Sequence, residues 1–242
     1  MRVRRLATAA FAAVFAVAGV AACSEDEGAD NTKTEAKALA DQAVAAMKKV
    51  QYIKGEAKGK DEEGKDVALS MCADMTGKTF SAKGTMAGHA VEMIEIGDDK
   101  YMKGDGKFWA SVTGGGEDPE AAATFDKVLG GKYVLTKADP GDEDGVTFFE
   151  GGTDGVTKGE VTTFQGKKAV PLVKTKSGDK TTYYVAAKGD PVVLGQLEEN
   201  KDGSRNEVTY SKSSKCEAQA PAKDQVMTDD DVEAALEAEK AA

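Results

Sequence analysis

The feature that most constrains the fold is a series of short segments, spread over Asp66–Lys212, in which apolar and polar residues alternate. Asp66–Met75 shows this period of two, and the period resumes over Thr79–Met86 after a turn that contains Gly77. Successive side chains of a strand point to opposite sides of a sheet, so the pattern predicts an antiparallel hairpin with one buried face. The buried side of this hairpin carries Val67, Leu69, Met71, Ala73, Phe80, Ala82 and Met86.

Further strands are expected on both sides of a central helical segment. Ala90–Ile96 has apolar residues at both alternating sets of positions, which predicts a central strand covered on both faces. Pro171 lies inside a later segment, where we expect an edge strand or a bulge. The later segments, separated by turns rich in Gly, Asp and Lys, are Val161–Phe164, Ala169–Lys174, Thr181–Ala187, Val192–Glu198 and Asn206–Lys212.

Two amphipathic helices are expected. Thr32–Glu35 (TKTE) has the spacing of a capping box and would begin the first helix, which ends near residue 49 or 50. Asp118 is the expected cap of the second helix, Pro119 suits its first position, and Gly130 ends it. The apolar faces carry Leu39, Ala43, Met47 and Val50 in the first helix, and Ala121, Phe125, Val128 and Leu129 in the second.

Helices and alternating strands in this order predict an α+β domain. A strongly curved antiparallel sheet, forming a half-barrel closed by two or more helices, satisfies the pattern, and a flatter sheet packed on helices satisfies it equally. We expect a single domain over residues 35–215 and a C-terminal tail over residues 216–242. The end of the tail, Thr228–Ala242, has a helix-start signature but few large apolar residues, so we expect a peripheral helix.

The first 23 residues indicate export. Three arginines precede an apolar run, Leu6–Ala22, which is short for a membrane-spanning helix but fits the core of a cleavable signal peptide. The run ends in VAAC, which resembles a bacterial lipobox. By that resemblance residues 1–22 form a lipoprotein signal peptide and Cys23 becomes the acylated N-terminus. The alternative is an ordinary secretory signal with an incidental cysteine.

The residues after Cys23 are expected to form a tether. Ser24–Asn31 is acidic and has nothing to bury, so residues 23–34 are predicted to be the lipidated cysteine and a flexible linker. A linker of about ten residues has a root-mean-square reach of about 16–19 Å. The domain would therefore sit close to the outer face of the cytoplasmic membrane.

The two remaining cysteines fit an oxidising compartment. If Cys23 is acylated, Cys72 and Cys216 are left as an even pair. We expect a disulfide between them, the alternative being two unrelated thiols.

Charge narrows the range of partners. Removal of the leader takes the 32 basic residues to 29, against 42 acidic ones. A chain with this excess of acidic residues is repelled by nucleic acid and by anionic lipid headgroups. We therefore expect the acyl anchor, rather than a basic patch, to attach the protein to the membrane. Arg205 is then the only arginine, which disfavours a dedicated clamp for anionic substrates.

No motif indicates catalysis or metal binding. The only histidine, His89, falls in a predicted surface turn, and no nucleophile motif accompanies it. Zinc sites need several closely spaced His or Cys ligands, and the sequence has none. The acidic segment ending at Gly145 resembles an EF-hand loop but lacks the first and last carboxylate ligands. We therefore expect no enzyme activity, no metal and no cofactor.

Methionine placement is the one feature that suggests a ligand. Flexible, polarizable methionines suit a surface that accepts variable apolar molecules. The alternative is that they fill the core between sheet and helices. The methionines in predicted strands are Met71, Met75, Met86, Met93 and Met102.

Three segments carry a family resemblance: Ile96–Trp109 (IGDDKYMKGDGKFW), Gly130–Val134 (GGKYV) and Ala169–Leu194. Together with the lipobox, the first helix and the hairpins, they resemble actinobacterial lipoproteins of the LppX/LprG type, whose fold is similar to that of the carrier LolA. The resemblance covers most of Glu35–Lys212. It implies a half-barrel whose apolar cavity holds acyl chains, and it carries no catalytic signature.

The leading hypothesis is an anchored, extracytoplasmic lipoprotein that binds a lipid or the acyl chains of a lipoglycan for transport or presentation at the cell envelope. The alternative is a non-enzymatic interaction module that binds an envelope protein or a cell-wall component. In the leading hypothesis the ligand lies on the apolar side of the strands. The expected lining residues are Val67, Leu69, Met71, Phe80, Met86, Val91 and Met93.

Overall fold

The computed structural model describes residues 28–116, 118–138, 148–149 and 151–241. The predicted signal peptide, Cys23 and the acidic segment ending at Gly145 lie outside the described residues. The helices within them are α1 (Ala36–Met47), α2 (Gly106–Val112), α3 (Pro119–Leu129) and α4 (Asp229–Lys240), with short 3-10 turns η1 (Asn31–Lys33) and η2 (Lys223–Gln225).

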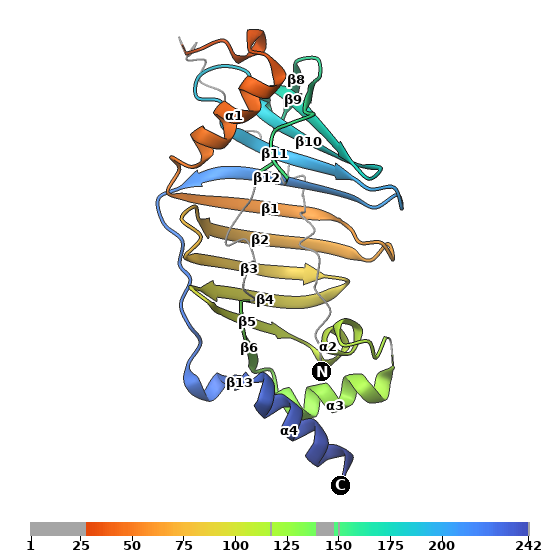
Figure 1. The fold of residues 1–242 in the computed structure, drawn as a ribbon. Helices are drawn as coiled ribbons and strands as arrows, with labels where there is room; N and C mark the ends of the chain where they lie inside the picture. The colour runs from red at the N-terminus through yellow and green to blue at the C-terminus, as the bar shows by residue number, and fades with distance from the viewer. Residues whose placement is uncertain (1–27, 117, 139–147, 150, 242) are drawn as a thin grey trace.

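A single curved sheet of 13 strands organises the described residues (Figure 1). Its spatial order is β13-β6-β5-β4-β3-β2-β1-β12-β11-β10-β9-β7, with β8 also paired to β9. Only the β13–β6 pair is parallel among the described strands. The sheet does not close on itself, so the predicted strongly curved sheet with helices is confirmed. The strands are β1 (Tyr52–Lys60), β2 (Asp66–Asp74), β3 (Thr79–Met86), β4 (His89–Ile96), β5 (Asp99–Gly104), β6 (Tyr133–Lys137), β7 (Thr157–Lys158), β8 (Thr162–Phe164), β9 (Lys167–Lys176), β10 (Asp179–Ala186), β11 (Val193–Glu199), β12 (Arg205–Ser213) and β13 (Val226–Thr228).

Each strand predicted from alternation is present, with small shifts at its ends. Pro171 lies in β9, next to the edge of the sheet. The short strands β7 and β8 pair with β9 on either side of this proline, and its carbonyl accepts a hydrogen bond from the Gly159 N–H at 2.9 Å. Proline has no N–H to donate, so the interruption between β7 and β8 leaves no donor of β9 unpaired there.

Two expectations about strands are corrected. β1 was not expected from alternation, because Gly55 and Gly59 break its apolar pattern, yet it joins the two halves of the sheet by pairing with β2 and β12. β4 is a strand within the sheet, as expected, but Val91 is its only buried residue. It is therefore not covered on both faces.

The helices differ from expectation at their starts. α1 buries the predicted face but has no capping box: Glu35 is the N-cap residue without a side-chain hydrogen bond, and the Thr32 hydroxyl bonds to Asp30 instead. α3 follows the prediction, with the Asp118 carboxylate accepting from the Glu120 N–H and Gly130 in the left-handed conformation at φ 55°. α2 was not expected.

Two separate clusters form the core. The first, called the α1 cluster, packs α1 against β9, β10 and β11; the second, called the α2–α3 cluster, packs α2, α3 and Leu236 of α4 against β2–β6. Ile53 belongs to the first cluster and Ala57 to the second. These residues are four apart on β1 and so point to the same side. Both helical layers therefore cover one face, called the helix-bearing face, at opposite ends of the sheet (Figure 1).

The described part of the predicted linker, residues 28–34, is bonded to the sheet and to the loop before β11. Asn31 is 2% exposed, its N–H donates to the Ala187 carbonyl at 3.0 Å, and its side-chain amide donates to the carbonyls of Ala186 and Gly189 at 2.8 and 3.1 Å. The Gly189 N–H in turn donates to the Ala29 carbonyl at 3.0 Å. This set of bonds is called the N-terminal clamp.

The C-terminal tail also belongs to the domain. After β12 the chain runs along the strand ends to β13, which adds a parallel strand next to β6 (Figure 1). α4 follows and begins with a capping box between Thr228 and Asp231. Both side-chain-to-backbone hydrogen bonds of this capping box are present, unlike in the predicted one at residues 32–35. Leu236 is its one buried described side chain, so the helix is peripheral although the tail completes the sheet.

Cys72 and Cys216 form a disulfide whose Cα atoms are 5.6 Å apart. It connects β2 to the segment after β12 and so spans β1, which lies between those strands. Cys72 alternates with Met71, so the disulfide lies on the face opposite the helices.

Removal of this disulfide should lower stability. The bond joins residues 144 apart, and the chain-entropy model gives about 4–5 kcal/mol for so long a loop, as an upper bound. We expect the Cys72→Ser/Cys216→Ser variant to unfold at lower urea concentration than the oxidised wild type. Reductant should lower the wild-type midpoint and leave that of the variant unchanged. Equal midpoints for oxidised and reduced wild type would contradict the prediction.

The N-terminal clamp should also be measurable. Asn31→Ala removes two hydrogen bonds from a buried side chain and leaves the carbonyls of Ala186 and Gly189 without these donors. We expect a loss of about 1–3 kcal/mol in the free energy of unfolding and faster hydrogen exchange over residues 28–34. Lys33→Ala is the control, because Lys33 is exposed and its ion pair with Asp30 contributes little.

Candidate ligand-binding face

One row of side chains crosses the middle of the helix-bearing face. The register pairs Tyr210 with Gly55, Gly55 with Met71, and Met71 with Ala82. Ala82 in turn pairs with Met93, and Met93 with Met102. Directly paired residues of a sheet point to the same side, so these residues form a continuous line from β12 to β5. This line is called the methionine strip; its members are Tyr210, Gly55, Met71, Ala82, Met93 and Met102.

Burial separates the strip from the rows beside it. Towards α2, the next row is closed: Val208, Leu69 and Val91 are at most 4% exposed. Towards α1, Ile53 and Ala73 are at most 2% exposed. The long side chains of the strip are only partly buried, and they flank the two clusters rather than belonging to them. The strip is therefore an apolar surface between two closed cores.

Small residues let the long side chains lie flat along the strip. A Cβ atom on Gly55 would come within 2.7 Å of Met71 Cγ and 2.9 Å of its Sδ, so the Met71 side chain lies over Gly55. In the neighbouring row a Cβ on Gly104 would come within 2.3 Å of the Phe108 ring, so this glycine admits α2 to the sheet. Because glycine and alanine have little or no side chain, neighbouring side chains can approach the backbone closely at these points.

Tyr210 ends the strip on β12. Its ring packs edge-on against Phe148 with centroids 5.2 Å apart. Burial raises the pKa of the Tyr210 phenol above its ordinary value, and the negative charge of Glu198 acts in the same direction. The phenol therefore stays neutral, and this end of the strip offers a hydroxyl group without a charge.

At the β4–β5 side the strip meets polar residues. Glu95 and Lys100 are paired across β4 and β5 in the row next to Met93 and Met102. The apolar surface thus has one polar border, a distribution that suits an amphipathic ligand.

The seven predicted lining residues share the helix-bearing face but not the same environment. Val67, Leu69 and Val91 are closed into the α2–α3 cluster, whereas Met71 and Met93 belong to the strip. Met86 flanks the α2–α3 cluster, and Phe80 flanks the α1 cluster. Tyr210, Gly55, Ala82 and Met102 were not among the predicted residues. Alternation identified the face, but the register that aligns these residues across strands was needed to find the strip.

His89 was expected in a surface turn, but the structure places it in a strand. It begins β4, and its Nδ1 lies 3.4 Å from an Asp105 carboxylate oxygen that also accepts the Phe108 N–H at the start of α2. This histidine therefore sits at the junction of α2 and the sheet. Within the described ranges, no group of three His, Cys, Asp or Glu residues has the geometry to hold a metal ion.

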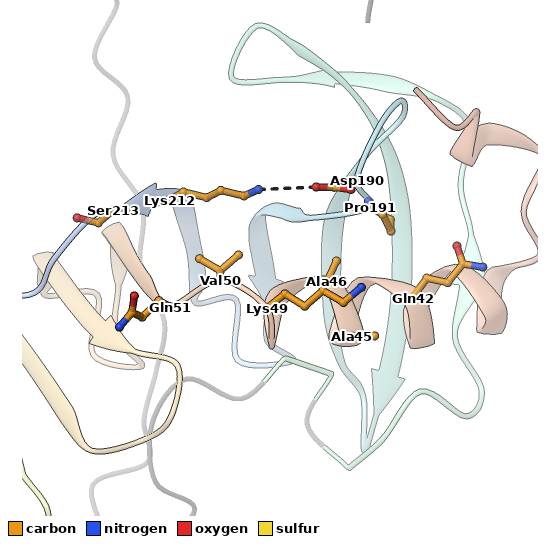
Figure 2. Close-up of a pocket in the computed structure, with 10 residues that line it drawn as sticks. All are labelled: Gln42, Ala45, Ala46, Lys49, Val50, Gln51, Asp190, Pro191, Lys212 and Ser213. Atoms are coloured by element: carbon orange, nitrogen blue, oxygen red, sulfur yellow. Dashed lines mark ion pairs between the residues drawn. The ribbon is translucent and has the colours of Figure 1, made fainter. Parts of the chain in front are cut away.

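A separate groove of about 560 Å³ lies beside the second half of α1, and Figure 2 shows its lining. None of the seven predicted residues lines this groove. Its walls come from α1, from the segment between α1 and β1, from the end of β12 and from the loop before β11. The lining residues are Gln42, Ala45, Ala46, Lys49, Val50, Gln51, Asp190, Pro191, Lys212 and Ser213.

None of the helices in the described residues is long and apolar enough to cross a membrane.

Comparison with known proteins gives distant structural likenesses. No protein-family model matches the sequence, and no curated protein matches it either. Among solved structures, the fold is similar to the lipoprotein LppX of Mycobacterium tuberculosis, with 12% identity and a TM-score of 0.49 over 76% of this chain and 97% of that chain. It is also similar to LprF from Mycobacterium bovis, with 13% identity and a TM-score of 0.46 over 77% of this chain and 97% of that one.

A third likeness is to an uncharacterized conserved protein from Thermus thermophilus, with 11% identity and a TM-score of 0.47 over 78% of this chain and 96% of that one. Identities and scores at this level carry no ligand or activity from one protein to another. Function is therefore argued below from the strip and the sequence.

Proposed function

We propose that this protein is a lipid-anchored envelope protein that binds a long apolar ligand, such as the acyl chain of a lipid or lipoglycan, along the methionine strip. The observation that carries the proposal is the exposure of the strip between two closed cores. Apolar side chains that pack only on their flanks still have surface to remove from water. Flexible methionine side chains adapt to acyl chains of different shape.

The dimensions of the strip support an acyl chain. The line from β12 to β5 crosses five strand spacings, about 24 Å at about 4.8 Å per strand. That is the scale of an extended long-chain acyl group. Each methylene moved from water to the strip contributes about 0.8 kcal/mol, so a few buried methylenes give measurable affinity. The contacts are non-directional, so the strip selects for apolar length rather than for a particular functional group.

The lipidated N-terminus is the second part of the proposal. The apolar run, the VAAC sequence and the acidic segment after Cys23 together support acylation of this cysteine. The anchor would hold the domain at the outer face of the cytoplasmic membrane, where its ligand is available.

A charge placed on the strip should abolish lipid retention. Met93 and Ile94 are neighbours on β4, both half-exposed, but they point to opposite faces of the sheet. In the soluble domain without Cys23, produced in a lipid-rich actinobacterial host, we expect Met93→Asp and Met71→Asp to reduce co-purifying lipid at least tenfold. The matched control Ile94→Asp should retain it. Mass spectrometry of organic extracts measures the lipid, and thermal unfolding confirms that each variant is folded.

Two outcomes would reject the strip as the binding site: a folded Met93→Asp variant with wild-type lipid content, or equal losses in the Met93 and Ile94 variants. Wild-type protein that contains no lipid and takes up none when challenged with vesicles would reject the ligand itself. It would then favour an interaction module.

Substitution of the lipobox cysteine should release the protein. We expect Cys23→Ser to move the full-length protein from the membrane fraction to the soluble fraction and to abolish incorporation of labelled palmitate. Cys72→Ser/Cys216→Ser is the control, because it also removes cysteines but leaves the lipobox intact. Unchanged membrane association and labelling of the Cys23 variant would contradict the anchor.

A further inference from the structure

The N-terminal clamp sets how the domain can sit on a membrane. Gly28 is the first described residue, and a Cβ on it would come within 2.5 Å of the Gly189 Cα, so the chain is in contact with the loop before β11 from this point on. The clamp at Ala29 and Asn31 holds the same loop. Only four residues lie between Cys23 and Gly28, and an extended chain spans at most about 18 Å over the five steps that join these two residues. If Cys23 is acylated, this loop lies within about 18 Å of the acylated residue.

The groove beside α1 lies directly next to the clamped loop. Asp190 and Pro191, which line the groove, follow Gly189 in the chain (Figure 2). The α3–α4 end of the domain is much farther away, because eight strand spacings, about 38 Å along the sheet, separate β10 from β6. A tether this short therefore keeps the groove near the bilayer, whereas the α3–α4 end is too far from the tether to be held there by it.

The chemistry of the groove fits the headgroup of a zwitterionic phospholipid. Its floor has apolar atoms from Ala45, Ala46 and Val50, while Lys49 and Lys212 supply positive charge. Asp190 lies 3.9 Å from the Lys212 ammonium group, in a pair exposed to solvent on both sides. Lysine ammonium groups bind phosphate as point charges, and a carboxylate beside them attracts the positively charged nitrogen of the headgroup.

The charge of the whole chain decides between headgroups. With 29 basic against 42 acidic residues after the leader, the protein is repelled by a strongly anionic surface. A zwitterionic headgroup adds no net charge and places both of its charges against opposite charges in the groove. This combination favours a zwitterionic over an anionic lipid.

We propose that the groove beside α1 is the membrane-facing surface of the domain and seats a zwitterionic phospholipid headgroup of the bilayer that holds the anchor. This inference rests on the proposed acylation of Cys23 and deepens the proposed function, because the groove adjoins the strip. Lys212 of the groove and Tyr210 of the strip point to the same side of β12, two residues and about 6.6 Å apart. A ligand that enters at the membrane side therefore has a short path to the strip.

The orientation is tested with the full-length acylated protein in phosphatidylcholine vesicles. Acylation occupies Cys23 and the disulfide occupies the other two cysteines, so one introduced cysteine is the only free thiol. Ala38→Cys on α1 and Ala234→Cys on α4 form a matched pair, since both replace an exposed helical alanine and neither lines the groove. Each variant is labelled with a fluorophore, and quenching by phosphatidylcholine that carries a nitroxide near its headgroup is measured.

We expect at least threefold stronger quenching at residue 38 than at residue 234. Equal quenching, or stronger quenching at residue 234, would overturn the membrane-facing orientation. Deletion of the clamp by Asn31→Ala should reduce the difference between the two positions, because it lengthens the free tether.

The headgroup seat is tested by charge reversal in the same vesicles. We expect Lys49→Glu/Lys212→Glu to reduce quenching at residue 38 at least twofold, with Lys127→Glu/Lys132→Glu at the far end of the domain as the control. Unchanged quenching in the groove variant would reject the seat. Failure of the anchor is recognised separately, as protein that does not float with the vesicles, and failure of the strip as lipid-free soluble domain in the mass-spectrometric assay.

Discussion

The antiparallel register from β12 to β5 is the constraint on which the rest of the structure depends. It aligns Tyr210, Met71, Met93 and Met102, which come from four strands and up to 139 positions of separation, into one line of side chains. Because the side-chain period of a strand is two, a slip of one residue in any of these pairs would send that strand's apolar residues to the other face. The two closed rows beside the strip, and the place of α2 over Gly104, depend on the same alignment.

The strip stays accessible because the helices are too short to cover it. α1 has 12 residues and α2 has 7, so they are about 18 and 10 Å long at about 1.5 Å per residue. They pack over opposite ends of a sheet of 13 strands, and the long side chains of the strip lie at the flanks of the two clusters rather than inside them. The apolar surface of the strip that stays in contact with water does not contribute the stabilisation of about 25 cal/mol per Å² that its burial would give. A bound acyl chain would recover that stabilisation, so the same geometry would account for both the exposure of the strip and the affinity that we propose for it.

Local sequence patterns predicted the strands, α1, α3 and the apolar face, because alternation and caps are properties of neighbouring residues. They did not predict β1. Its glycines at residues 55 and 59 are explained only by the adjacent strands, where Met71 and Asn206 occupy the space that a Cβ atom would need. The capping box predicted at residues 32–35 does not form, and the neighbouring Asn31 instead donates three hydrogen bonds to the end of β10 and to the loop after it. Tyr210 belongs to the strip through its pairing with Gly55, and no pattern local to β12 records that pairing.

The disulfide and the clamp each join parts of the chain that are far apart in the sequence. β12, β1 and β2 carry the part of the strip between the two helical layers, and the Cys72–Cys216 bond ties the flanks of these strands together from the opposite face. Since Cys72 points away from Met71, the bond adds stability without occupying the surface that a ligand needs. The clamp ties the N-terminal segment to the end of β10 and to the loop that follows it, through three hydrogen bonds donated by Asn31. Covalent and buried polar contacts thus stabilise the domain without covering the apolar surface of the strip.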